Sequence, residues 1–311
     1  MQSFGSHNTN CGNLTNSNNM TITLNKADDE DNQIKKWLSP LEPRHRHRSV
    51  QANRLDGVGR WLLEKNEFQE WSGTQQVPKQ SVLFCYGDPG VGKTHIRLAG
   101  KPSNKWISLT AINNSSLVID WLCDQARNKD IVVAGLYCDY LAQEEQSTTN
   151  MLGAILKQLL ERDGIPDHVR QAFRKEKGGF GGRAVRLSDL VEMLKATIAL
   201  LPEVFICIDG LDECVPDNRR ELLESLQDIV QASPTTRVFL SGRPHIQDEV
   251  KKSITGAITI AVIPTIKDIE IYLKMRLDRD TTPNAMDDDL RAEIMRIIPG
   301  TFPKCRYRQP L

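Results

Sequence analysis

The chain has no excess of charge of either sign. Its 311 residues include 40 basic and 40 acidic side chains, so the formal net charge is zero. A neutral chain gives no sign of the broad electrostatic field that attracts nucleic acid or an anionic membrane. It also lacks any apolar run near the roughly 20 residues of a membrane span, and its N-terminus is polar where a signal peptide is apolar. We therefore expect a cytoplasmic protein with no nucleic-acid and no membrane partner.

Paired metal-binding cysteines are missing as well. The chain has seven cysteines, an odd number, and none of them belongs to a C-x-x-C pair. Cys85 and Cys207 lie inside apolar runs that predict core strands. This usage is typical of reduced thiols in a cytosolic protein and argues against a zinc site.

What the chain does contain is a complete phosphate-binding loop. The sequence GDPGVGKT at residues 87–94 matches G-x-x-x-x-G-K-[ST] and follows an apolar run over residues 81–86. In such a loop, backbone N–H groups at a helix N-terminus face the phosphates, the lysine reaches the β- and γ-phosphates, and the hydroxyl binds Mg²⁺. The residues expected to hold the nucleotide are Gly87, Asp88, Pro89, Gly90, Val91, Gly92, Lys93 and Thr94.

An acidic segment downstream predicts the metal side of the same site. Residues 204–208 are five apolar residues without alternation, which is typical of a buried parallel strand, and Asp209 follows directly. We expect Asp209 to hold Mg²⁺ together with Thr94, and Asp212 or Glu213 to polarise the attacking water.

A third segment points to the γ-phosphate. Residues 237–240 predict a short apolar strand that leads into the sequence SGRP, where Arg243 is placed to sense the γ-phosphate. Together the three segments predict a site for ATP, or GTP, with Mg²⁺.

These motifs resemble those of the NACHT class of STAND signalling ATPases. The narrower likeness, over residues 34–299, is to fungal, NLR-like proteins with a nephrocystin-like N-terminal NTPase domain, which is usually followed by ankyrin or other repeats. The resemblance implies a cytoplasmic switch that binds nucleotide, hydrolyses it slowly if at all, and signals by self-association or through effector proteins. Two alternatives stay open: an enzyme on the same fold, such as an AAA-type ATPase, and a fragment that binds no nucleotide.

The order of apolar segments predicts an α/β fold, a three-layer P-loop NTPase with a central parallel sheet. We expect a disordered Asn-rich tail (1–32), a helical lead-in (33–78) with one helix over 52–69, the NTPase domain (79–264) and a truncated helical segment (265–311). Further expected strands cover 131–138 and 258–263, and further expected helices cover 149–161, 166–174, 219–231 and 266–277, with Ser188 capping another.

Two short stretches do not follow this plan. The helix that should continue from Lys93 meets Gly100 and Pro102 almost at once, and the apolar stripe resumes only at Leu117, so residues 98–115 are interpreted as an insertion. Residues 43–48 read PRHRHR. This basic run is either a contact for a phosphate or an acidic partner, or a solvated helix entry.

Overall fold

The computed structural model describes residues 29–52, 54–73, 80–87, 114–127, 129–177, 184–278 and 288–301. They form one five-stranded sheet in the order β2-β3-β4-β1-β5, and every neighbouring pair is parallel. The strands are β1 (Val82–Tyr86), β2 (Ile131–Tyr137), β3 (Glu203–Asp209), β4 (Thr236–Gly242) and β5 (Ile258–Ala261). The predicted α/β class and its parallel sheet are thus confirmed.

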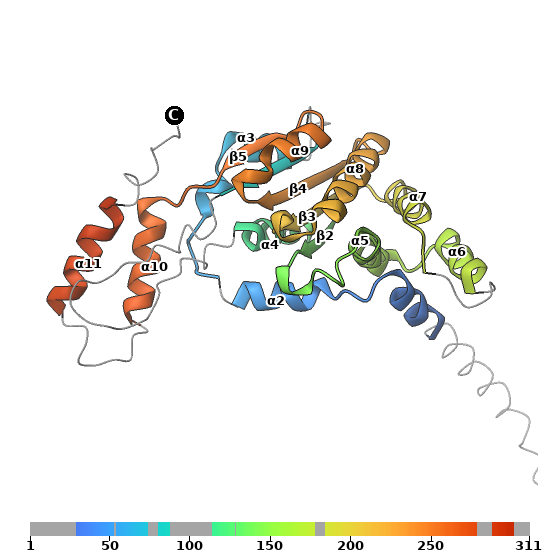
Figure 1. Cartoon of the computed structure of the whole chain (residues 1–311), viewed down its shortest axis with the longest axis horizontal. Coiled ribbons are helices and arrows are strands. Elements are labelled where there is room, and N and C mark those ends of the chain that lie inside the picture. Colours follow the sequence, from blue (N-terminus) through green and yellow to red (C-terminus); the bar gives the residue numbers. More distant parts are fainter. Residues whose placement is uncertain are drawn as a thin grey trace, which may run out of the picture.

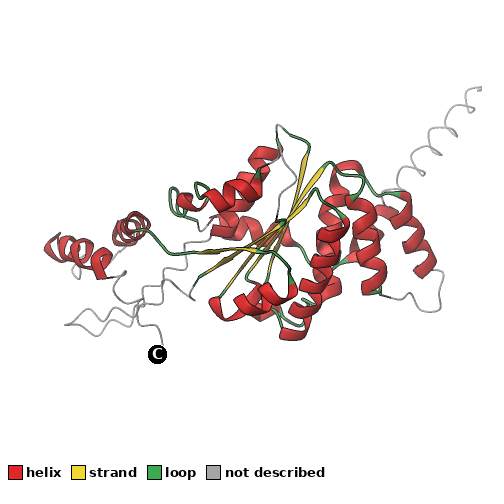
Figure 2. Cartoon of the chain, turned by 90° about the horizontal axis from the view of Figure 1, so that it is seen from above, coloured by secondary structure: helices red, strands yellow, loops and turns green. Residues whose placement is uncertain are grey.

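Helices cover both faces of the sheet, which gives three layers (Figure 2). One face packs against α5 (Thr148–Asp163), α7 (Leu187–Ile198), α8 (Pro216–Ala232) and α9 (Gln247–Ser253). The other packs against α3 (Asn66–Ser72) and α4 (Asn114–Ala126). In addition, α2 (Pro43–Ala52) lies beside the edge strand β2, and α6 (Asp167–Lys177) lies beyond α7 (Figure 1).

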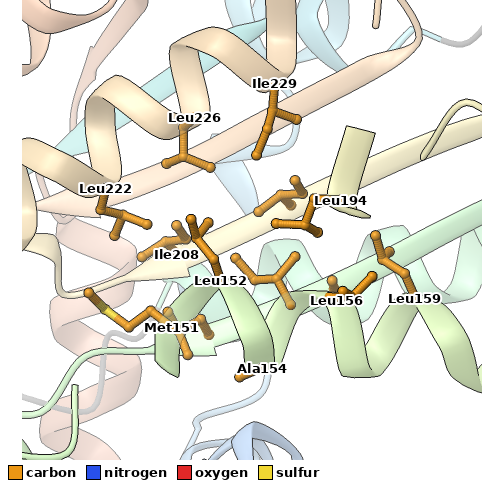
Figure 3. Close-up of a cluster of buried hydrophobic side chains, with 14 of the residues drawn as sticks. Met151, Leu152, Ala154, Leu156, Leu159, Leu194, Ile208, Leu222, Leu226 and Ile229 are labelled. Atoms are coloured by element: carbon orange, nitrogen blue, oxygen red, sulfur yellow. The ribbon is translucent and has the colours of Figure 1, made fainter. Parts of the chain in front are cut away.

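Alternation along the strands decides which side chains meet which helices. Successive residues of β3 point to opposite faces, so Ile206 and Ile208 join the α5 side whereas Phe205 and Cys207 join the α3 side. Figure 3 shows the α5 side, where Leu152 and other aliphatic side chains of three helices meet over Ile208. Parallel strands buried on both faces need such continuous apolar runs, and that is why the sequence predicted them.

The five cysteines in the described ranges are free. Cys85 lies in β1 and Cys207 in β3, as their apolar surroundings predicted, and both are buried. Burial raises the pKa of both thiols far above the ordinary value, so these side chains are unreactive packing groups.

The lead-in differs from its prediction. In place of one helix over 52–69, α2 ends at Ala52, a short helical turn η1 covers Arg60–Leu62, and α3 begins at Asn66. Gly57 and Gly59 have positive φ values of 84° and 80°, a conformation that ends a helix and that glycine adopts at little cost. The apolar residues of this segment do reach the sheet, but they do so from the turn η1 and the helix α3 and not from one continuous helix.

A buried carboxylate fixes this turn. Asp268 accepts hydrogen bonds from the Gly59 backbone N–H (2.8 Å) and from the Trp61 indole N–H (2.9 Å). It also accepts from Thr265, just before helix α10 (Ile266–Asp278). The lead-in and the start of α10 are therefore joined through one side chain.

The C-terminal part of the described chain is a helix pair beyond the sheet (Figure 1). Helix α10 matches the expected helix over 266–277, and α11 (Asp288–Thr301), which the sequence did not predict, packs on it through Leu277 and Ile294. The predicted cap of α7 is wrong, because Arg186 precedes the helix and Ser188 bonds to Asp189 instead. No helix in the described ranges has the length and apolar character to cross a membrane.

Candidate functional site

The carboxyl ends of β1, β4 and β3 form the edge on which the predicted site residues converge. Strand β4 lies between the other two, and Gly87, directly after β1, donates its N–H to the carbonyl of Gly242 at the end of β4 (3.2 Å). On the other side of β4, the N–H of Gly210 donates to the Ser241 hydroxyl (3.0 Å). Gly87 and Asp209 are therefore separated by a single strand at the same end of the sheet.

Gly87 passes close to a neighbouring backbone. A Cβ atom placed on it would lie 3.0 Å from the carbonyl oxygen of Val262, which follows β5. That atom is backbone and cannot move aside easily, so the first position of the motif tolerates no side chain without a shift. Gly87 is the one described residue of the predicted loop; Asp88 to Thr94, including Lys93, lie outside the described residues.

Asp209 ends β3 and accepts two hydroxyl hydrogen bonds on the same carboxylate oxygen. Ser115, in the first turn of α4, donates to Oδ1 at 2.5 Å, and Ser241, at the end of β4, donates to Oδ1 as well. Neither serine was predicted from the sequence to have a role. Ser115 is distant from Asp209 in the sequence, and Ser241 was noticed only as part of the turn before Arg243. No local sequence pattern therefore predicts that either serine contacts Asp209.

Asp212 and Arg243 are paired with each other. The Arg243 guanidinium lies 2.8 Å from Asp212 Oδ2, and the Arg243 backbone N–H donates to Oδ1 at 3.1 Å. The Asp212 side chain is 7% exposed whereas that of Arg243 is 44% exposed. These two contacts hold the Asp212 carboxylate beside the carboxyl end of β4, where it is directed at Arg243.

Glu213 is the more available of the two candidate bases. Its carboxylate accepts a hydrogen bond from the Tyr140 backbone N–H (3.1 Å). Partial burial raises the pKa of Glu213, the Tyr140 hydrogen bond opposes this, and the nearby carboxylates of Asp212, Asp139 and Asp209 raise it further. A carboxylate whose pKa is raised in this way is better suited to accept a proton than an ordinary surface glutamate.

The described part of this edge fits a magnesium-bound polyphosphate. Asp209 supplies one carboxylate flanked by two hydroxyls, and Gly87 keeps the approach from β1 clear. Sites for Mg²⁺ on nucleotides use one or two carboxylates and complete the shell with phosphate oxygens and water. In the described ranges no cluster of three or more His, Cys, Asp or Glu side chains could hold a metal by itself.

Three solved structures are similar to the chain at low sequence identity. Orc1 of Aeropyrum pernix, in complex with DNA, is similar with a TM-score of 0.44 and 18% identity over 85% of this chain and 59% of that one. Cdc6p from Pyrobaculum aerophilum has a TM-score of 0.42 and 13% identity over 84% of this chain and 57% of that one. Drosophila ORC bound to DNA has a TM-score of 0.38 and 17% identity over 64% and 42%. The chain thus spans less than two thirds of each of these structures.

One expectation from the composition is wrong. We expected that nucleic acid is excluded as a partner, but two of the similar structures are complexes with DNA. A net charge is a sum over the whole chain and says nothing of how the charges are spread over the surface. Neutral composition therefore excludes no class of partner here.

The family match covers both halves of the site. A family model described as nephrocystin 3, N-terminal, matches residues 57–98 and 113–243, which is more than half of the chain. The match includes the phosphate-loop sequence, the acidic segment and Arg243. No curated protein matches the sequence. Because the model matches more than half of the chain, the chain belongs to the nephrocystin 3 N-terminal family.

Proposed function

We propose that the chain is a nucleotide-binding signalling switch of the NACHT type, which binds ATP, or GTP, with Mg²⁺ and hydrolyses it slowly. The observation that carries this proposal is the convergence of Gly87, Asp209 and Arg243 at the ends of three neighbouring strands. Ligands of α/β sheets bind at this edge, beyond the carboxyl ends of the strands.

The residues divide the work as follows. Gly87 to Thr94 hold the phosphates, Thr94 and Asp209 hold the metal, and Glu213 orients and polarises the attacking water. Bound Mg²⁺ neutralises charge on the phosphate oxygens. Asp212 is the poorer base of the acidic pair because Arg243 already occupies its carboxylate. Slow turnover follows from having a single free carboxylate, with a protein side chain competing for the arginine.

The Asp212–Arg243 pair supplies the switch. Arg243 contacts Asp212 through Nε, and a γ-phosphate bound by its other guanidinium N–H groups would compete with the Asp212 carboxylate for the same cation. Binding of a triphosphate therefore draws Arg243 away from Asp212, whereas a diphosphate leaves the pair intact. The exchange reports the γ-phosphate to η3 (Leu211–Glu213), which contains Asp212, and to η4 (Pro244–Ile246), which directly follows Arg243.

Fluorescent-nucleotide titration with and without Mg²⁺ tests the binding. Lys93→Ala should abolish binding, and Lys251→Ala, a matched change of an exposed lysine on α9, should leave it unchanged. Unchanged affinity in the Lys93 variant would refute the site. Phosphate release, measured on the same samples, separates a slow switch from an efficient AAA-type enzyme.

Discrimination between ATP and ADP tests the switch. Arg243→Ala should lose about tenfold of any preference for ATP, the equivalent of roughly one charge-assisted contact. Asp212→Asn should increase that preference, because it releases the arginine. A loss of preference in the Asp212 variant would contradict the exchange. Sedimentation velocity with ATP and with ADP tests whether self-association follows the triphosphate state, as the NACHT resemblance implies.

We also propose that residues 98–115 include an insertion. The family match stops at residue 98 and resumes at 113, and α4 begins at Asn114, which supports this interpretation. Sequencing of spliced transcripts tests it: most reads should lack the codons of the insertion. If most reads retain them, the segment is part of the protein and a non-binding form becomes the better hypothesis.

A further inference from the structure

A separate cavity lies on the opposite side of β2 from the rest of the sheet's strands. It has a volume of about 270 Å³ and opens between α2, α4 and the edge strand β2. None of the nucleotide-site residues that the structure describes lines it. Its size is close to the lower end of the range of about 300–1,000 Å³ typical of small-molecule pockets.

The floor of the cavity is apolar. Ile119 of α4 and Val133 of β2 line it, and Gly135 contributes bare backbone between them. A Cβ atom on Gly135 would lie 3.3 Å from Ile119 Cδ1, so a larger side chain at this position would fill space that glycine leaves open. The cavity therefore depends on the glycine in the edge strand.

The edge of β2 at this point is closed to a further strand. Gln158 of α5 accepts a hydrogen bond from the Gly135 N–H (3.0 Å) and donates one to the Gly135 carbonyl (3.0 Å). With both backbone groups occupied by one side chain, an extended peptide cannot pair with the strand here. This favours a small ligand over a protein segment.

The rim of the cavity is basic. Arg44, His47 and Arg48 lie on one side of α2 at helical spacing, and the described residues that line the cavity include no carboxylate. Arg44 has an ion pair with Glu161, outside the lining, whereas Arg48 has no ion pair among the described residues and is exposed. One cation is thus available at an apolar opening.

The wall beside this cation is held rigidly. His47 contacts the Tyr137 hydroxyl through Nδ1 (2.6 Å) and Asp120 through Nε2 (3.0 Å), and Arg54 anchors Asp120 at 2.5 Å. These contacts join α2, β2 and α4, the three elements that bound the cavity. A preorganised wall lowers the conformational cost of binding.

We propose that this cavity binds a small organic anion, a carboxylate with an aromatic or branched apolar body. Its carboxylate pairs with Arg48 at the rim, and its body lies against Ile119, Val133 and Gly135. This assignment resolves the basic run over residues 43–48 as a ligand contact. It does not depend on nucleotide binding.

A built-in reporter allows a direct test on the full chain. Cys123 lines the cavity and is the exposed cysteine of the five in the described ranges. Benzoate, 4-methylpentanoate and 2-naphthoate are titrated against alkylation by N-ethylmaleimide, with peptide mass spectrometry to follow Cys123 alone. We expect at least one carboxylate to slow the alkylation, with a dissociation constant on the order of 1 mM or tighter for a ligand of this size.

Three variants and a neutral probe decide the outcome. Arg48→Glu should weaken protection about tenfold, the loss expected for a charge-assisted contact. Gly135→Val should abolish it by filling the floor, and Arg220→Glu, a matched reversal outside the lining on an exposed side chain, should not change it. Circular dichroism confirms that each variant is folded. The proposal is overturned if no carboxylate protects Cys123, if 2-naphthamide protects as well as 2-naphthoate, or if an acidic peptide alone protects.

Discussion

The two faces of the sheet are stabilised in different ways. On the α5 side the contacts are nearly all aliphatic and are spread over helices α5, α7 and α8 (Figure 3). On the α3 side, five of the fourteen residues in the buried cluster are aromatic. Among them, Trp71 packs edge-on against Phe205 at 5.4 Å between ring centroids and also contacts Phe239. A buried cation lies among these rings.

That cation is Arg237 in β4, which is 2% exposed. It pairs with Glu203 of β3, donates to the carbonyl of Gly73 (2.6 Å) and stands over the Phe205 ring at 5.4 Å. One side chain thereby links two strands to the end of α3. The comparison teaches that stability is distributed on the aliphatic face and concentrated in a few polar contacts on the aromatic face.

Removing the cation should have the largest effect. Arg237→Ala leaves Glu203 buried without its partner, so we expect a loss of about 3–5 kcal/mol in the free energy of unfolding, measured with urea. Replacing both residues with methionine should recover most of this loss, because neither charge then remains buried. A cost below about 0.5 kcal/mol for the single variant, the range of ordinary surface changes, would break the comparison.

Shortening a buried side chain on the α5 side of the sheet should lower the free energy of unfolding slightly less. Leu226 of α8 is fully buried, and Leu226→Ala should lower the free energy of unfolding by about 2–5 kcal/mol. Leu141→Ala is the matched control, because Leu141 is 92% exposed. Equal results for the two leucines would show that this face contributes little.

Crowding on the same face gives a third test. A Cβ atom on Gly153 of α5 would lie 1.9 Å from the Leu38 carbonyl oxygen. Gly153→Ala should therefore destabilise by about 1–3 kcal/mol, although alanine is the better helix former. Gly135→Ala, which meets only the flexible end of Ile119, is the comparison. Thermal melts of both variants measure the difference, and a stabilised Gly153 variant would contradict the packing described.

The smallest effect is expected at Glu213, at the carboxyl end of the sheet, where the free energy of unfolding should change with pH. The pKa of Glu213 is raised by burial, so the folded protein holds a proton that the unfolded chain releases. The free energy of unfolding should then fall as pH rises from about 4, the ordinary range for glutamate, through the folded-state pKa. Glu213→Gln should flatten this slope and be neutral or stabilising at pH 7. Urea titrations between pH 4 and 8 measure it, and an unchanged slope would contradict the raised pKa.

Local patterns accounted for most of the fold and indicated the residues proposed for the site. Apolar runs such as residues 204–208 predicted the strands because a parallel strand buried on both faces has to be apolar along its length. Where backbone conformation took precedence over periodicity the prediction was wrong, as at Gly57 and Gly59. Residues 247–253 carry too short a pattern to have predicted α9.

The sequence by itself determined the class of sheet and the order of its strands along the chain, and it led to the proposed type of ligand, because each depends on residues that are adjacent in the chain. Only the tertiary structure decided the partners of the acidic residues. Asp212 is held by Arg243, and Asp209 is met by Ser115 and Ser241, because β4 lies between β1 and β3. The order of strands across a sheet is a property of packing, and no local pattern encodes it.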